Sequence, residues 1–503
     1  MTFTIENVLL IGAILIFVSI LVSKGGFKYG VPTLLIFLLV GMIFGVDGVG
    51  IHFNDYRIAQ FVGTIALSVI LFAGGMDTQF SSIKSILYPG IVLSTVGVLL
   101  TTIFTGLFIW GVSFMFNFST EVSLLFALLL AATMSSTDSA SVFNILRSQK
   151  IGLRNNLKPL LELESGSNDP MAYMLTIVLI QIIMNGGSHT MSVWEILLMF
   201  VLQFIVGAGL GVILGKLGAW FINRVNLPNR ALYPILVVSF IFFIFSITNL
   251  LKGNGFLAVY LAGIIMGNQR LVASKKIDAF LNGIVWLLQI IMFLMLGLLV
   301  NPHEMIRVAI PAIIIAVFMI FVGRPLSVFL SLIPFRKIKF KDQLFVSWVG
   351  LRGAAPIIFS ISPVVAGVEG ASIIFNVVFF ITLISLILQG TTIPLVARWL
   401  HLEEQTDDSP ANFGVEIPEE LNTILKQEIV DKDALLKDYP LPLGSLVVIV
   451  KRNHKYIVPN GKLMLHQGDK LLLISEKEQK TEKKLLTELE KSTHNLFKRK
   501  QKD

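Results

Sequence analysis

Long apolar segments alternate with short polar loops through about the first 400 residues of the chain. A helix that crosses a bilayer needs about 20 mostly apolar residues. The pattern predicts an α-helical polytopic membrane protein with a membrane domain at residues 1–400. About thirteen transmembrane helices can be drawn, with approximate limits 7–23, 29–47, 57–76, 88–115, 121–147, 157–184, 192–223, 231–250, 254–268, 280–300, 304–332, 341–366 and 372–399.

The loops between these segments alternate in charge. One set carries seventeen Lys and Arg residues, whereas the other carries only Arg57, Lys252 and Arg307. Because basic loops stay in the cytoplasm, we expect the N-terminus outside and everything after Arg398 inside. That orientation requires an odd number of spans, which favours thirteen over twelve. The basic loops are those with Lys24, Lys28, Lys84, Arg147, Lys150, Arg154, Lys158, Arg224, Arg230, Arg270, Lys275, Lys276, Arg336, Lys337, Lys339, Lys341 and Arg398.

Two of the expected spans are interrupted at mid-membrane. The fifth contains a polar run from Thr133 to Ser141, and the twelfth contains the run GLRGAAP from Gly350 to Pro356. Glycine and proline are poor residues for a helix interior. Spans five and twelve would occupy matching positions in two inverted six-helix repeats joined by a linking seventh span. Paired interrupted helices in matching positions indicate the binding site of a transporter.

Polar residues with oxygen atoms concentrate in spans five and six. Asp138 and Asp169 are the carboxylates well inside these spans, and a polar group at membrane depth is costly unless it faces protein or water. A carboxylate can hold a proton or a cation but not both at once, which is a sufficient basis for exchange. A polar network that only holds helices together is the alternative, but two such carboxylates favour an ion and proton site. The candidate ligands of a monovalent cation are Thr137, Asp138, Ser165, Asn168 and Asp169.

Other charged residues in these spans have simpler roles. Glu164 and Arg352 have opposite charge, and a structural ion pair between them would make each tolerable inside the bilayer. Glu162 lies near the cytoplasmic end of span six, where a solvated funnel is expected. Arg324 has no evident partner in the sequence.

Composition narrows the function further. Charged residues make up 14% of the chain, against about 25% in soluble proteins. There is no cysteine, so disulfides and thiolate metal sites are excluded. Seven scattered histidines offer no catalytic set, so no enzyme activity and no cofactor are expected. The first apolar segment has Glu6 before it and Lys24 after it, the reverse of a signal peptide, and is expected to be retained.

The chain changes character after Leu400. Residues 401–415 read as a linker, 416–480 as a small α/β cytoplasmic domain and 481–503 as a charged tail. Within the domain, residues 421–436 could supply a helix, and Leu446–Val450 and Lys470–Ile474 have the composition of strands.

The motifs of the membrane domain resemble those of NhaP-type cation:proton antiporters. The matching residues are Thr137-Asp138, Glu162-Leu163-Glu164-Ser165 with Asn168-Asp169, and Gly350-Leu351-Arg352-Gly353. The resemblance implies thirteen helices, a homodimer in the bacterial inner membrane, and elevator-like alternating access. It also implies that Asp169 binds the ion, that Asn168 supports it, that Glu164 pairs with Arg352, and that exchange is electroneutral. Many sodium-handling relatives carry an acidic residue where this chain has Ala73, which weakens the case for sodium.

The C-terminal domain resembles the TrkA-C (RCK-C) module of potassium transport systems. The similar residues are in the runs Pro442–Val448, Val458–Gly461 and Gly468–Leu471. This resemblance implies regulation by a small ligand such as a nucleotide, and favours potassium. The expected function is potassium/proton antiport for cation and pH homeostasis, with membrane lipid and a second copy as partners and no nucleic acid. A sodium/proton antiporter on the same scaffold is the main alternative. A gated cation channel is less favoured, because no selectivity-filter run is present.

Overall fold

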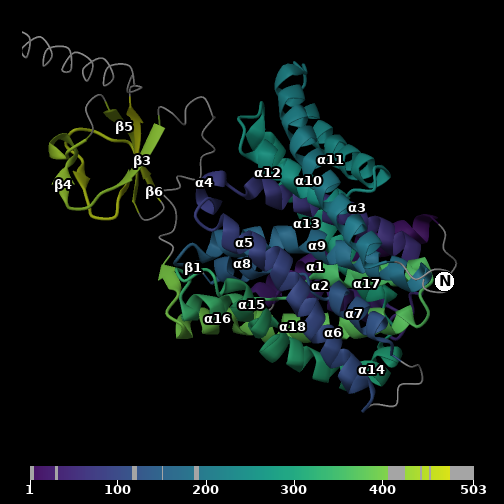
Figure 1. The fold of residues 1–503 in the computed structure, drawn as a ribbon. Coiled ribbons are helices and arrows are strands. Elements are labelled where there is room, and N and C mark those ends of the chain that lie inside the picture. The colour runs from purple at the N-terminus through teal and green to yellow at the C-terminus, as the bar shows by residue number, and fades with distance from the viewer. Residues whose placement is uncertain are drawn as a thin grey trace, which may run out of the picture. The chain divides into compact units, whose positions relative to one another are not determined.

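The computed structural model describes residues 5–28, 32–115, 122–149, 151–185, 192–405, 425–441, 445–452 and 455–475. The chain divides into two compact units, Met1–Gln405 and Thr406–Asp503. The first unit is helical and the described part of the second consists of strands and turns (Figure 1).

The first unit is a bundle of apolar helices. Among the described residues, eight helical segments are long and apolar enough to cross a membrane, and five apolar helices are shorter. This agrees with a polytopic membrane protein, while the count of thirteen spans stays a prediction. The helices are α1 (Ile5–Lys28), α2 (Thr33–Phe44), α3 (Tyr56–Asp77), α4 (Phe80–Ile83), α5 (Leu87–Val92), α6 (Val98–Ser113), α7 (Leu124–Thr133), α8 (Ser139–Ser148), α9 (Leu157–Asn185), α10 (Val193–Arg224), α11 (Leu232–Leu250), α12 (Gly255–Gly267), α13 (Ser274–Leu299), α14 (Pro302–Phe318), α15 (Arg324–Leu332), α16 (Phe340–Trp348), α17 (Ala354–Ala366) and α18 (Ala371–Trp399).

Two long helices contain a π-helical turn. The turn η1 (Leu93–Gly97) lies between α5 and α6, and η2 (Met319–Gly323) lies between α14 and α15. Such turns are rare and often mark functional regions. They fall in the expected fourth and eleventh spans, which are seven apart.

The two expected interruptions are present, which confirms that part of the prediction. An irregular segment separates α7 from α8, and another separates α16 from α17. The first segment ends at Asp138, whose carboxylate caps α8 by accepting a hydrogen bond from the Ser141 N–H. The two segments meet, because the Asp138 N–H donates to the Leu351 carbonyl at an N···O distance of 2.8 Å.

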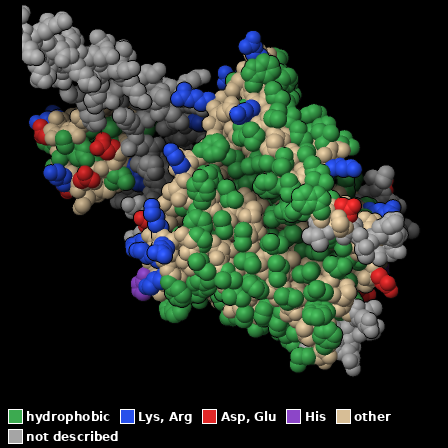
Figure 2. Space-filling model, in the orientation of Figure 1, with side chains coloured by type: hydrophobic (Ala, Val, Ile, Leu, Met, Phe, Trp, Pro, Cys, Tyr) green, Lys and Arg blue, Asp and Glu red, His purple; other side chains and the backbone are tan. Residues whose placement is uncertain are grey.

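The outer surface of the first unit is largely apolar, as expected of a lipid-facing surface. Figure 2 shows apolar side chains over most of the visible face, with Lys and Arg gathered along the edge that carries β1 (Ile151–Leu153) and α16. Helix α10 exposes much of its apolar surface, whereas α17 is buried along most of its length. The teal helices α10, α11 and α12 pack side by side in Figure 1.

A two-stranded antiparallel sheet includes the last residues of the first unit. Strand β2 (Glu403–Gln405) pairs antiparallel with β1, so Ile151 faces Gln405 and Leu153 faces Glu403. The expected linker at 401–415 is therefore wrong at its start, where the backbone pairs with the membrane unit. Residues 406–415 lie outside the described part.

The described part of the second unit is a β-structure. Its main sheet has the order β3-β8-β5-β6, and β4 pairs with β7. The expected strands at 446–450 and 470–474 are confirmed, but the helix expected at 421–436 is wrong over its described residues, which form β3, β4 and the start of a 3-10 turn. The residues 442–444 and the tail at 481–503 lie outside the described part. The strands are β3 (Leu425–Ile429), β4 (Ala434–Leu435), β5 (Ser445–Arg452), β6 (Lys455–Ile457), β7 (Met464–Leu465) and β8 (Lys470–Ser475).

One buried carboxylate organises a turn of this unit. Asp469 is almost fully buried, and its two oxygens accept hydrogen bonds from Arg452 at 2.9 and 2.6 Å. Burial alone would raise the pKa of Asp469, but the hydrogen bonds from Arg452 and from the His466 N–H lower it below its ordinary value.

The helix expected at 421–436 is wrong because residues 425–429 pair with β8. This pairing involves residues distant in the chain, and it decides the local structure.

Candidate functional site

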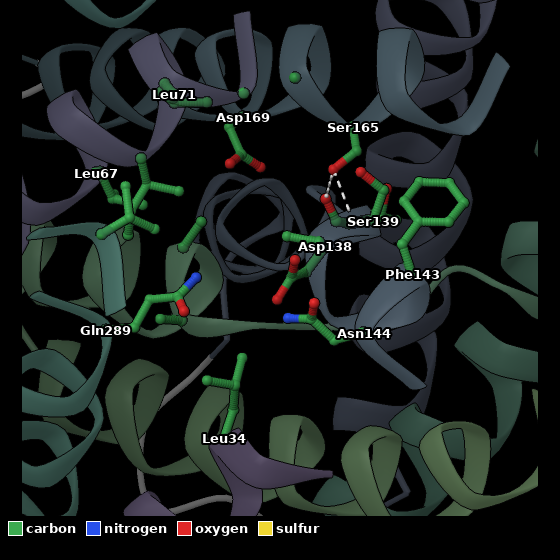
Figure 3. A pocket seen from close by; sticks show the side chains of 18 of the residues that line it. Leu34, Leu67, Leu71, Asp138, Ser139, Phe143, Asn144, Ser165, Asp169 and Gln289 are labelled. Carbon is green, nitrogen blue, oxygen red and sulfur yellow. Dashed lines mark hydrogen bonds between the residues drawn. The ribbon is translucent and has the colours of Figure 1, made fainter. Parts of the chain in front are cut away.

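A cavity of about 260 Å³ lies beside the two interrupted segments. It is bounded by residues of α2, α3, α8, α9, α12, α13 and α17 and by the irregular segment that precedes α8 (Figure 3). Four of the candidate ligands line it: Thr137, Asp138, Ser165 and Asp169.

The two carboxylates face this cavity from different elements. Asp138 lies at the N-terminus of α8 and accepts hydrogen bonds from the Ser141 hydroxyl and backbone N–H. Asp169 lies within α9, and its Oδ1 atom is fully buried without any hydrogen-bond partner among the described residues. The buried Ser136 hydroxyl is likewise unpartnered. An unpaired buried carboxylate oxygen is costly, so Asp169 is the group in this cavity that most needs a proton or a cation.

Asn168 and Ser165 tie α9 to the irregular segment before α8. The Asn168 Nδ2 donates to the Thr137 hydroxyl at 2.6 Å, and the Ser165 hydroxyl donates to the Thr137 carbonyl at 2.7 Å. The Ser139 N–H in turn donates to Ser165 Oγ at 2.9 Å. Asn168 is 0% exposed and does not line the cavity. The structure therefore puts Asn168 behind Thr137 and not in the cavity itself.

The buried ion pair differs from the expected one. Glu164 pairs with Arg324 on α15, and both side chains are almost fully buried. No ion pair between Glu164 and Arg352 occurs in the described part of the chain, so the expected partner was wrong. Arg352 instead donates to the Ser136 carbonyl, which braces the irregular segment before α8. Sequence alone could not choose between two arginines on different spans, since the choice depends on how α9 and α15 pack.

The mouth of the cavity carries charge of both signs. Glu162 lines it and lies 3.8 Å from the Lys158 ammonium. Asp77, at the end of α3, also lines it and was missed by the sequence analysis. The signal was a lone carboxylate after the Gly74-Gly75 pair. Ala73 is not among the cavity-lining residues of α3.

The lining contains further uncharged polar side chains that were missed, among them Asn144, Tyr260 and Gln289. In Figure 3, Asn144 and Gln289 point toward Asp138 from opposite sides. Tyr260 and Gln289 lie in segments that read as ordinary apolar helices, and Asn144 follows the polar run of the fifth span without belonging to it, so no local pattern distinguished them.

The chemistry of this cavity suits a monovalent cation. Its polar atoms are carboxylate, hydroxyl, amide and backbone oxygens, which are hard ligands. In the described ranges, no group of three or more His, Cys, Asp or Glu side chains could hold a metal ion. The arrangement can bind a proton or an alkali cation at Asp169 and Asp138.

Comparison with known proteins identifies relatives along nearly the whole chain. The K(+)/H(+) antiporter NhaP of Alkalimonas amylolytica is 39% identical over 479 residues, which cover 93% of this chain and 81% of that protein. The K(+)/H(+) antiporter NhaP2 of Shewanella sp. (strain ANA-3) is 39% identical over 483 residues, covering 94% and 82%.

A solved structure shares the fold. The sodium proton antiporter MjNhaP1 from Methanocaldococcus jannaschii superposes with a TM-score of 0.67 at 23% identity, covering 79% of this chain and 99% of that one. The profile of the family described as sodium/hydrogen exchanger, transmembrane, matches residues 11–399. That range contains the cavity, both interrupted segments and the buried ion pair, and the chain belongs to the sodium/hydrogen exchanger family.

Proposed function

We propose that this protein is a secondary active transporter that exchanges potassium for protons across the bacterial inner membrane. The observation that carries the proposal is the unpartnered Asp169 oxygen beside Asp138 in a cavity lined by hydroxyl and amide groups. This group is satisfied when it holds either a proton or a cation.

The exchange follows from competition at one carboxylate. A cation that enters the cavity displaces the proton from Asp169, and a proton displaces the cation on the other side of the membrane. Asp138, Ser165 and Thr137 supply further oxygens, while Asn168 holds Thr137 in position. One proton against one cation makes the exchange electroneutral.

Potassium is the favoured ion. Both curated relatives described above are named K(+)/H(+) antiporters. The third span also lacks the carboxylate of sodium-handling relatives, because the residue there is Ala73. Sodium is the second candidate, since the solved structure with the same fold is titled a sodium proton antiporter. At 23% identity, that likeness supports the fold and not the choice of ion.

The proposed topology has thirteen spans in two inverted six-helix repeats, with the N-terminus outside. The π-helical turns η1 and η2 support the repeat, since they fall in the matching fourth and eleventh spans. The basic edge near β1 and α16 in Figure 2 supports a cytoplasmic location for that edge. The exposed basic residues in or near β1, α16 and the end of α18 are Arg154, Lys158, Lys337, Lys341 and Arg398.

We further propose a homodimer in lipid, regulated through the C-terminal unit. The exposed apolar surface of α10 is suitable for contact with lipid or a second copy. The β-structure of the described residues between 425 and 475 is compatible with a TrkA-C-like module that binds a small ligand such as a nucleotide. Elevator-like movement of the helices around Asp169 would provide alternating access.

Reconstitution tests the function directly. Purified protein in liposomes with a pH-sensitive dye inside should release luminal protons when potassium chloride is added outside, and not when choline chloride is added. Absence of any cation-driven pH change in well-folded protein would overturn the proposal, and a current without proton coupling would indicate a channel.

A further inference from the structure

One side of the cavity, formed by α12 and α13, has no role in the exchange mechanism proposed above. Asp138 precedes α8 and Asp169 lies on α9, whereas α12 and α13 contribute Tyr260 and Gln289 to the same cavity. Both are uncharged, polar and buried, with exposed fractions of 1% and 7%.

Tyr260 lies against the α9 helix close to Asp169. A Cβ atom at Gly166 would come within 3 Å of the Tyr260 ring and hydroxyl, so the ring packs directly on the α9 backbone there. Gly166 is four residues after Glu162 and three before Asp169. At 1.5 Å per residue, the hydroxyl lies beside α9 about 6 Å past the level of Glu162 and about 4.5 Å before that of Asp169. Tyr260 therefore stands between the mouth of the cavity and its deep carboxylate.

The Tyr260 hydroxyl is buried and has no hydrogen-bond partner among the described residues. Two hydroxyls lie near the Tyr260 hydroxyl, those of Thr78 and Ser167, but neither meets the geometry of a hydrogen bond to it. The Thr78 hydroxyl donates to the Gly74 carbonyl at 2.8 Å. Buried hydroxyls are normally hydrogen-bonded, and an exception calls for a ligand, a water or another cause.

Gln289 faces the carboxylates from α13. Its side chain points toward Asp138 across the cavity in Figure 3. Its amide makes no hydrogen bond to any described residue. By contrast, the buried Gln389 amide on α18, outside the cavity, donates to the Trp348 carbonyl at 2.8 Å. The Gln289 amide oxygen is thus free to contact a ligand in the cavity.

We infer that the Tyr260 hydroxyl and the Gln289 amide are further contacts of the transported cation. The inference rests on the proposed exchange at Asp169. A cation moving from Glu162 toward Asp169 passes the Tyr260 oxygen and reaches a cavity in which Gln289 supplies a neutral oxygen opposite Asp138. Neutral oxygens replace hydration water at a lower field strength than a carboxylate, which suits the larger and more easily dehydrated potassium ion.

A different result is expected if the two side chains only pack against their neighbours and do not contact the cation. If Tyr260 only fills space against Gly166, then removal of an unpartnered buried hydroxyl is neutral or stabilising. Cation affinity would then be unchanged. The two possibilities therefore separate in one variant, Tyr260→Phe, which keeps the ring.

The experiment compares Tyr260→Phe and Gln289→Met with a matched control, Tyr173→Phe. Tyr173 lies on α9, packs against Phe256 and Phe359, and does not line the cavity. Half-maximal potassium concentrations are measured in proteoliposomes. Potassium-dependent stabilisation is measured by thermal unfolding in detergent, with choline chloride holding the ionic strength constant.

We expect Tyr260→Phe and Gln289→Met each to raise the half-maximal potassium concentration about tenfold, the effect of losing one contact to a charged group. Their stabilisation by potassium should shift to correspondingly higher concentration, while unfolding in choline stays at the wild-type temperature. Potassium responses equal to those of Tyr173→Phe in both variants would overturn the inference. A wild type that shows no response to potassium in either measurement would overturn the proposed function itself.

Discussion

The backbone N–H of Asp138 donates a hydrogen bond to the carbonyl oxygen of Leu351, at an N···O distance of 2.8 Å. This bond joins the irregular segment between α7 and α8 to the one between α16 and α17. Regular helices could not make it, since their N–H and carbonyl groups bond within the helix. The two interruptions are thus one structural unit, and the carboxylate at the site is fixed by a residue more than 200 positions away in the chain.

Gly353→Ala should disable the site without removing any ligand. An added Cβ would lie within 3 Å of the Asp138 carboxylate and Cβ. The two segments would have to separate, and a displacement of about 1 Å at a reacting group can cost about 100-fold in rate. We expect exchange in proteoliposomes to fall by about that factor. The control is Gly111→Ala on α6, where an added Cβ meets nothing within 4 Å. Equal activity of the two variants would contradict the close contact.

Asp169→Asn should abolish exchange while the protein remains folded. Asparagine cannot gain or lose a proton in the physiological range, so the competition between proton and cation disappears. Dye-loaded proteoliposomes should give only the background signal with potassium or sodium. Glu369→Gln, an exposed carboxylate between α17 and α18, serves as the control and should exchange normally. Retained exchange in the Asp169 variant would refute the shared-carboxylate mechanism.

Glu164→Gln or Arg324→Gln should destabilise the protein more than it changes cation affinity. Each variant leaves one buried charge without its partner, at a cost of about 3–5 kcal/mol. The double variant should recover much of the lost stability, because no unpaired charge remains. Thermal unfolding in detergent measures this, with half-maximal potassium concentrations measured in parallel. A double variant no more stable than either single variant would argue against direct pairing.

Local chemistry made much of the site predictable. A carboxylate in an apolar span has a high free-energy cost, so its presence indicates a function. Asp138 and Asp169 were predicted as site residues for this reason. Glycine and proline marked both interruptions for a similar reason. These signals depend on what a residue costs in its own segment and not on its neighbours in space.

The remaining features depend on packing between distant segments. Arg324 and Arg352 are equivalent as partners for Glu164 until the fold brings Arg324 of α15 to Glu164 of α9. Tyr260 and Gln289 are unremarkable in their own helices and acquire meaning only from facing the cavity. The residues of β3 were expected to be helical because the local sequence does not reveal that they pair with β8, which is distant in the chain.

Truncation of the C-terminal unit should preserve exchange if the cut respects β2. A chain ending at Gln405 keeps the β1–β2 pairing and the hydrogen bond from the Arg154 N–H to the Leu402 carbonyl. A chain ending at Leu400 loses several such bonds, each worth about 1 kcal/mol. We expect the chain that ends at Gln405 to exchange potassium without regulation. The chain that ends at Leu400 should unfold at a lower temperature. Inactivity of a well-folded 1–405 chain would refute a purely regulatory role for the second unit.

Potassium should be carried at least as well as sodium, and one added carboxylate should reverse that preference. Among the cavity-lining residues of α3, only Asp77 is acidic, and it lies at the end of the helix. Gly74 also lines the cavity, and a Cβ atom added there would meet nothing within 4 Å. A carboxylate at this position would strengthen the field at the site, which favours the smaller ion because stronger attraction offsets its larger dehydration cost. Half-maximal concentrations for potassium and sodium should therefore be measured at one pH for the wild type, Gly74→Asp and Gly74→Asn. The asparagine variant has the same shape without the charge, so it should keep the wild-type preference, while Gly74→Asp should move toward sodium. A wild type that responds to sodium at much lower concentration, with no response to potassium, would show that the proposed ion is wrong.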